Sequence, residues 1–395
     1  MITSRRQYYN RTIEITQMND LTKPAQISNA LKCKGCGALL HFVPGTHSLQ
    51  CDYCGENNPI EQSATATEIT AVDFEDYVGN IDTGKQLNNQ QIVDCHNCGS
   101  RTVLDNFVTS DKCPFCASPL VLNLGSGLQY VPPHYILPFE VTKEQGADFF
   151  KKWLAGLWWA PNDLAKKVSN SSSILNGVYL PHWTYDMNTI TRYTGERGDY
   201  YYTTETYTVN NNGQSETRTR QVRHTRWSYA SGTVHCKFED LIVPASRSLP
   251  EETLVKLEPW KFSNLVKFDE RYTSGFRSET YQLDPEKGLV KAIEQTVSQI
   301  NDTIRDDIGG DEQRIDHTDT QYNNKAIKYI MLPVWVSAYN YNNKVYQFTV
   351  NASTGEVIGQ RPLSYIKIAL AILFAIALII AAVMYFRNQN AGPQY

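Results

Sequence analysis

Eight of the nine cysteines fall into two copies of one spaced pattern. In each copy, two residues separate the cysteines of a pair and fourteen separate the two pairs. Four thiolates at this spacing can surround one Zn2+ tetrahedrally, because each tight turn aims two sulfurs at the metal and the intervening chain returns as a short hairpin. The sequence therefore predicts two zinc ribbons, with the ligands Cys33, Cys36, Cys51 and Cys54 in the first and Cys95, Cys98, Cys113 and Cys116 in the second.

We expect these sites to be structural, since four thiolates complete the coordination of zinc and leave no open position for a substrate. Gly37 and Gly99 follow the second cysteine of each first pair, where the turn is expected to need a positive φ. His41, His47 and His96 lie near the cysteines as competing ligands. Chance spacing and disulfide pairing are the alternative interpretations, and the equal spacing of two copies argues against both.

Two other sets of side chains could do hydrolytic chemistry. One is His182 with Asp186, and the other is the acidic group Asp307, Asp311 and Glu312. A lone histidine among aromatic strand residues is more often packed and hydrogen-bonded than catalytic. The chain also contains no Gly-x4-Gly-Lys-Ser/Thr phosphate loop. We therefore expect no catalytic and no cofactor-binding residues beyond the zinc ligands, with a membrane-bound hydrolase as an alternative.

The C-terminal segment Ile368–Phe386 runs nineteen residues without a charge. As a helix it would cover about 28 Å of hydrocarbon. A buried core helix is the alternative, but such a helix would normally be shorter and would carry a polar stripe. The segment predicts a transmembrane helix over 366–386 and a short tail over 387–395, which makes the protein single-pass and tail-anchored. Its interfacial anchors would be Tyr365, Lys367, Tyr385 and Arg387.

The cysteines also bear on the orientation in the membrane. Thiolate ligands need a reducing compartment, and the first residues lack the apolar core of a secretory signal. Arg361 and Lys367 flank one side of the predicted span against Arg387 on the other. We expect an inner-membrane protein with its N-terminal bulk in the cytoplasm.

The rest of the chain is expected to be α+β and rich in strands. A content of 41% hydrophobic and 11% aromatic residues supports a packed core, and 37 basic against 41 acidic residues indicate no polycation. The predicted organisation is a flexible leader over 1–30, with Met18 as an alternative start, the first ribbon over 31–60, a linker with a short helix over 61–92, the second ribbon over 93–122, and a mixed α/β body over 130–363.

Local signals place several elements in these regions. Thr142 and Gln145 have capping-box spacing ahead of a bulky apolar stripe that ends before Pro161. The remaining expectations are a linker helix around Phe74–Ile81, a hairpin over 190–238 that turns at Asn210–Gly213, a helix over 284–308, paired strands over 328–338 and 344–350, and a further turn at Thr354–Gly355.

Two segments, Gly177–Trp183 and Tyr329–Trp335, share a Leu-Pro-x-Trp core. The match favours an internal duplication. Each half would contain a helix, a strand that carries the motif, and a following hairpin.

These segments together resemble a bacterial family of membrane-anchored double zinc-ribbon proteins. Its members carry names such as primosomal protein N-prime (replication factor Y), superfamily II helicase-like or TFIIB-type zinc ribbon-containing protein. The resemblance extends from Cys33 to the predicted transmembrane helix. It rests on the sequence segments Gly177–Tyr185, Tyr193–Tyr200, Asp307–Arg314 and Leu332–Trp335. It implies a zinc-binding integral membrane protein, found in some bacteria beside membrane-stress proteins of the flotillin-like and phage-shock types. A helicase motor would need the phosphate loop that this chain lacks.

Charge decides between the remaining functions. Between Cys33 and Cys116 there are four basic and eleven acidic residues. A surface that binds phosphate needs more basic than acidic residues. One basic stretch, Arg218–Arg226, could meet anionic lipid or an acidic partner, or form a solvated strand face balanced across its hairpin. We expect a non-catalytic adaptor that binds two structural zinc ions, the bilayer and protein partners, without a small-molecule substrate. A nucleic-acid-binding ribbon protein is the first alternative.

Overall fold

The computed structural model describes residues 33–38, 40–61, 69–82, 91–94, 99–104, 110–112, 115, 119–121, 132–168, 175–211 and 214–390. The predicted leader, all four cysteines of the second ribbon and the end of the tail lie outside these residues. Within the described part, the fold is α+β as predicted, with a mixed α/β body, a four-cysteine cluster and one apolar C-terminal helix.

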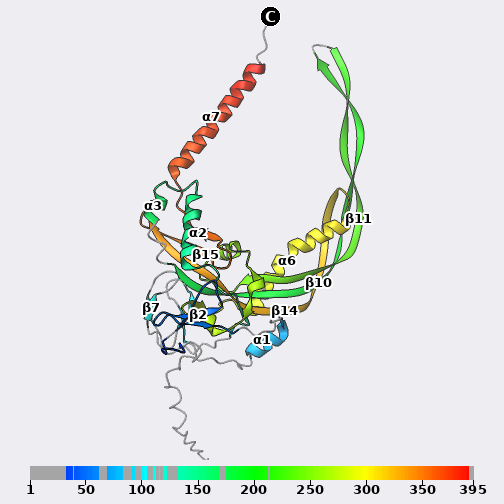
Figure 1. Cartoon of the computed structure of the whole chain (residues 1–395). Helices are drawn as coiled ribbons and strands as arrows, with labels where there is room; N and C mark the ends of the chain where they lie inside the picture. The colour runs from blue at the N-terminus through cyan, green and yellow to red at the C-terminus, as the bar shows by residue number, and fades with distance from the viewer. Residues whose placement is uncertain are drawn as a thin grey trace, which may run out of the picture.

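Two long antiparallel strands form the centre of the molecule (Figure 1). Strand β10 (Asn176–Asn211) pairs with β14 (Glu312–Tyr341) over most of the length of β14. Strand β11 (Gln214–Pro244) pairs with the other edge of β10 and completes the predicted hairpin. Strands β15 (Lys344–Asn351) and β16 (Val357–Gly359) extend the sheet from β14, which confirms the predicted strand pair around Asn342.

Short strands complete the main sheet, whose order is β12-β9-β14-β10-β13-β6-β5, with β4 on β14. Two of these short strands, β5 and β6, come from the second ribbon region. They pair with each other, and β6 joins the main sheet by pairing with β13. The first ribbon has a separate sheet, β1-β2-β3, and β7 pairs only with β8. Their bounds are β1 Leu40–Phe42, β2 Ser48–Cys51, β3 Asn57–Pro59, β4 Val72–Asp73, β5 Gln91–Asp94, β6 Arg101–Leu104, β7 Ser110–Lys112, β8 Pro119–Val121, β9 Tyr135–Ile136, β12 Val266–Lys267 and β13 Arg277–Glu279.

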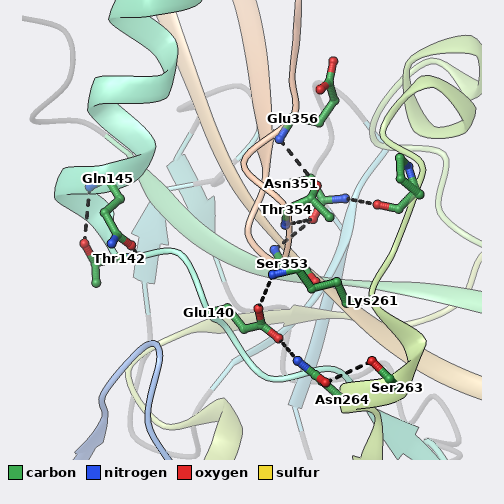
Figure 2. A network of polar contacts seen from close by, with 11 residues as sticks. Glu140, Thr142, Gln145, Lys261, Ser263, Asn264, Asn351, Ser353, Thr354 and Glu356 are labelled. Atoms are coloured by element: carbon green, nitrogen blue, oxygen red, sulfur yellow. Dashed lines mark hydrogen bonds and ion pairs between the residues drawn. The ribbon is translucent and has the colours of Figure 1, made fainter.

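The helices predicted around Phe74, Thr142 and Asp284 are present and begin at or next to these residues. Helix α2 (Lys143–Ala155) has the capping box, with Thr142 and Gln145 bonding to each other's backbone N–H groups; Figure 2 shows it near the turn at Asn351. Helix α6 (Pro285–Ile308) ends at Gly309, and α1 (Phe74–Asp82) is the linker helix. The others are α3 Leu164–Val168, α4 Glu251–Lys256, the 3-10 turn Phe262–Asn264, α5 Glu270–Thr273 and α7 Tyr365–Asn390.

Both faces of β10 and β14 are buried around the Leu-Pro-x-Trp segments. Side chains alternate between the faces of a strand. One face carries Tyr179, Trp183 and Trp335, which belong to a core shared with α2, α6 and the first ribbon. The opposite face carries aliphatic side chains such as Leu180 and Leu332, which pack with α4 and Trp260 in a second core.

The two Leu-Pro-x-Trp segments lie side by side and antiparallel, with Leu180 opposite Leu332. The Trp183 indole N–H donates to the Leu283 carbonyl at 2.8 Å, and the Trp335 indole N–H donates to the Val141 carbonyl at 2.9 Å. Each acceptor stands two residues before the first residue of a helix, α6 in one case and α2 in the other. The two tryptophans therefore occupy equivalent positions, as an internal duplication requires.

The backbone around the tryptophans repeats in the same way. The Ala245 N–H donates to the Pro181 carbonyl, and the Ala245 carbonyl accepts from the N–H groups of Gln282 and Leu283. In the same way, the Ala352 N–H donates to the Pro333 carbonyl, and the Ala352 carbonyl accepts from the N–H groups of Glu140 and Val141. The repeat thus includes the residues just after β11 and β15 and the residues just before α6 and α2, which contact the two motifs.

A glycine faces each indole. Gly146 and Gly288 are both the fourth residue of their helices. A Cβ at Gly146 would lie 3.2 Å from Cδ1 of Trp335, and one at Gly288 would lie 3.0 Å from Cδ1 of Trp183. A Cβ at either position would therefore crowd its indole more tightly than most Cβ contacts do.

The hairpin of β10 and β11 continues beyond the sheet as an arm. Strand β14 supports it as far as Gly198, and two strands alone continue to the pair Asn211 and Gln214. The arm and α7 project from the same side of the body (Figure 1). Arg220 pairs with Glu205 across the hairpin at 3.0 Å, and Arg223 lies 4.2 Å from the ring of Tyr200. These contacts favour the balanced strand face among the interpretations of the basic stretch.

Glu279 is buried where β13 meets β6. Its carboxyl group bonds to the hydroxyls of Ser246 and Ser248, at 3.0 and 2.5 Å, and accepts from the Gln282 amide at 2.5 Å. Burial nevertheless raises the pKa of Glu279 to about 8, because these bonds compensate only part of the lost hydration. The native state therefore holds a proton at a pH where the unfolded chain has released it.

We predict that Trp183→Phe and Trp335→Phe destabilise the protein by similar amounts, about 1–3 kcal/mol each, because each leaves a buried carbonyl without its donor. Thermal unfolding of the full chain in detergent would measure this. Trp158→Phe is the control, since Trp158 is exposed and its loss should change the melting temperature little. Clearly unequal losses for Trp183→Phe and Trp335→Phe would contradict the equivalence of the two sites.

We predict that the Glu279 contribution makes the wild-type protein lose stability as the pH rises from about 5 to about 8. The unfolded carboxyl ionises near pH 4.3, whereas the native one stays protonated up to about pH 8. Bound protons are then more numerous in the native state, so the slope of stability against pH is negative. Glu279→Gln should flatten that slope, and Glu294→Gln on the exposed face of α6 should not. A slope that Glu279→Gln leaves unchanged refutes the assignment.

Candidate metal centre

The four cysteines of the first ribbon converge. All of their sulfurs lie within 4.8 Å of one another, with 3.5 Å between Cys33 and Cys54 and 3.5 Å between Cys36 and Cys51. Zn–S bonds of about 2.3 Å in a tetrahedron place sulfurs about 3.8 Å apart. Disulfide sulfurs would be only about 2.05 Å apart. The spacing therefore fits a thiolate metal site and excludes disulfides within this cluster.

Two equivalent turns aim the sulfurs inward. The Gly37 N–H donates to the Cys33 carbonyl and the Gly55 N–H to the Cys51 carbonyl, each at 2.9 Å. These glycines have φ values of 73° and 77°. The predicted positive φ is confirmed at Gly37 and at Gly99, where it is 75°. Gly55 was missed by the sequence reasoning, although it too follows the second cysteine of its pair.

The sulfurs cannot all ionise without a cation. A hydrogen bond from the Cys54 backbone N–H is the main cause that lowers the pKa of Cys51 to about 7. The Glu56 backbone N–H favours the Cys54 thiolate in the same way, but the neighbouring sulfurs outweigh it and raise the pKa of Cys54 to about 12. A metal ion that binds here must therefore displace protons, as thiolate sites generally require.

The body closes one side of this site. Cys33 and Cys51 are buried, whereas Cys36 and Cys54 face solvent. The Phe42 ring packs edge-on against Tyr272, with 5.2 Å between the ring centroids. Backbone bonds join Phe42 to Ser274 and Gly45 to Phe139. The first ribbon is thus part of the main core, and only its outer rim is accessible.

Two of the histidines near the cysteines have other partners. The Nε2 atom of His41 lies 3.2 Å from Asp52, and Nδ1 of His47 lies 3.3 Å from the Tyr272 hydroxyl. His96 lies outside the described residues. In the described part of the chain, the metal-ligating group therefore consists of the four cysteines.

Paired strands flank the cysteines of the second ribbon. Asp94 at the end of β5 pairs with Arg101 at the start of β6, and Lys112 of β7 pairs with Pro119 of β8. Each cysteine pair of this ribbon thus falls between two antiparallel strands. Because the cysteines themselves lie outside the described residues, the second zinc ion stays a prediction.

The histidine candidate for hydrolysis is packed inside the sheet. Nδ1 of His182 lies 3.1 Å from the Leu180 carbonyl, and burial lowers the pKa of His182 to about 4. Asp186 instead accepts from the Lys328 ammonium at 3.0 Å. The two side chains therefore have different partners.

The acidic candidates bond to β10 from the end of α6 and from the start of β14. Asp307 accepts from the Tyr193 hydroxyl at 2.5 Å. Asp311 accepts from the Tyr200 N–H at 2.6 Å and Glu312 from the Tyr200 hydroxyl at 2.8 Å. Asp307 thus joins β10 to α6, whereas Asp311 and Glu312 join β10 to the connection from α6 to β14.

An ion group around a buried lysine escaped the sequence reasoning. The Lys328 side chain is only 7% exposed and lies 3.0 Å from Asp186 and 2.7 Å from Asp240. A bulge between Tyr185 and Met187 allows both carboxylates to reach it. The only signal was a lysine in an otherwise apolar strand segment.

Comparison with curated proteins finds the uncharacterized protein YdjG of Bacillus subtilis (strain 168). The two chains are 26% identical over 348 residues, which cover 86% of this chain and 91% of YdjG. No family model matches the chain, and no solved structure matches it. The similarity extends over nearly the whole length of both proteins, so it includes more than the cysteine pattern.

We predict that the full chain binds two zinc ions and that Cys51→Ser retains one, since it removes a ligand from the first site only. Metal analysis of protein purified in detergent would count the ions. Cys236→Ser is the matched control, because Cys236 lies in β11 with its sulfur near Thr303, and it should retain two. Unchanged zinc in Cys51→Ser would show that the first cluster does not hold the metal, and one ion in the wild type would rule out the second site.

Proposed function

We propose that this protein is a non-catalytic, membrane-anchored adaptor whose zinc ribbons dock other proteins. The observation that carries the proposal is the closure of the first cluster by four sulfurs. A zinc ion with four protein ligands has no position for a substrate, so its role is to hold a surface in shape. The proposal includes a second zinc in the other ribbon.

The outer rim of the first ribbon offers a docking surface. Tyr53, between Cys51 and Cys54, is 89% exposed on a turn that the metal would rigidify. Exposed aromatic residues on rigid supports are frequent anchors in protein interfaces. Its neighbour Asp52 and the acidic residues of the ribbon regions would repel a phosphate backbone, which favours a protein partner over nucleic acid.

Helix α7 supplies the anchor in this proposal. The segment Tyr365–Phe386 is long and apolar enough to cross a membrane, with a mean hydropathy of 2.9 and none of its most apolar stretch buried against the protein. An apolar helix left uncovered is expected to be covered by lipid. We place it in a bacterial inner membrane with the ribbons in the cytoplasm, where thiolates stay reduced. Membrane-stress proteins of the flotillin-like or phage-shock types are the partner class that we propose.

We predict that crosslinking in intact cells, followed by mass spectrometry, joins at least one protein to the 31–60 region. Tyr53→Ala should reduce that crosslink several-fold, because it removes the proposed anchor. Tyr229→Ala is the control, since Tyr229 is an equally large exposed side chain on the arm.

The adaptor proposal fails if no crosslinked protein depends on Tyr53. It also fails if the purified full chain retards DNA at low salt with an affinity that falls as salt rises, because that behaviour indicates phosphate binding.

A further inference from the structure

The loop between α2 and α3 is fastened to the start of α7. The Ser364 N–H donates to the Trp159 carbonyl at 2.7 Å. The Lys367 ammonium donates to the carbonyls of Trp158 and Ala160, at 3.0 and 2.8 Å. This loop therefore lies where the apolar helix leaves the body, although about two hundred residues separate the two in sequence.

The loop turns its aromatic side chains outward. Trp158 is 78% exposed and Trp159 is 38% exposed, whereas Trp183, Trp260 and Trp335 are buried in the body. Large exposed side chains surround the same place on α7 and its approach, namely Leu363, Tyr365 and Ile366. An exposed apolar cluster of this kind marks a surface that something else covers.

Most backbone polar groups of the loop are already satisfied. The N–H groups of Leu157, Trp158 and Ala160 donate to carbonyls of the preceding turn. The Trp158 and Ala160 carbonyls accept from Lys367, so the lysine charge also stays at the start of α7. Such a loop can leave bulk water while most of its backbone groups keep their hydrogen bonds.

We propose that the loop of residues 156–161 is a second membrane contact, with Trp158 and Trp159 seated at the boundary between lipid headgroups and acyl chains. Tryptophan favours this boundary because its ring is apolar and its N–H can bond to headgroups or water. The contact would hold the body against the bilayer and restrict its rotation about α7. This inference rests on the proposed anchoring by α7.

The test uses the tryptophan fluorescence of the full chain in phosphatidylcholine vesicles that carry bromine on the upper acyl chain. Bromine quenches only nearby indoles, so Trp158→Phe should lose much of the lipid-quenched emission and Trp159→Phe a further part. Trp260→Phe is the control, since Trp260 is buried in the body and its indole N–H has no hydrogen-bond partner there. That variant should leave the lipid-quenched emission unchanged.

Three results overturn the inference in distinguishable ways. Full-length protein that does not float with the vesicles refutes both the anchor and the loop contact. Protein that floats, but whose lipid-quenched emission is the same in Trp158→Phe, refutes the loop contact alone. Trp158 emission that resists both bromolipid and the aqueous quencher acrylamide shows that a protein surface, from a partner or a second copy, covers the loop instead.

Discussion

Two buried indole N–H groups determine how the body is assembled. A polar hydrogen in an apolar core must find an acceptor, and Trp183 and Trp335 find theirs in the carbonyls just before α6 and α2. Each bond therefore fixes where a helix starts relative to the sheet. Both tryptophans lie on one face of β10 and β14, so the two helices cover the same face. The glycines at the fourth helical positions favour this close approach, because a Cβ there would crowd the indole.

Much of the secondary structure could be predicted because its signals are local. The capping box of α2, the apolar spacing of α6 and the turn around Asn342 depend on neighbouring residues, and the structure has all three. The length of the arm could not be predicted in this way, because the alternating polar sequence of the hairpin does not indicate where its pairing with β14 ends. The contacts of Trp183 with Leu283 and of Trp335 with Val141 join residues far apart in sequence. In the sequence, only the shared Leu-Pro-x-Trp motif indicated that the two segments are related.

For the candidate metal centre, spacing alone predicted that the four cysteines of the first ribbon converge, because a thiolate site needs few residue types at short separations. The surroundings of the site were less accessible to sequence reasoning. The docking of the ribbon through Phe42 depends on Tyr272 and Phe276, which belong to a distant part of the chain. The predicted span likewise follows from composition, whereas the attachment of its root to the loop at Trp159 depends on tertiary structure.

The arm and α7 rise from the same side of the body (Figure 1), and this sets a condition on the anchored state. Beyond Gly198 the arm is a two-stranded ribbon with open edges and arginine side chains. Hydrocarbon offers no partners to unpaired peptide groups, so such a ribbon cannot share the depth of the bilayer with an embedded helix. If α7 spans a membrane as proposed, one projection must lean away from the other. Residues 361–363 lie between Gln360, which bonds to β15, and Ser364, which bonds to Trp159, so a change of this angle falls on these three residues or moves the loop together with α7.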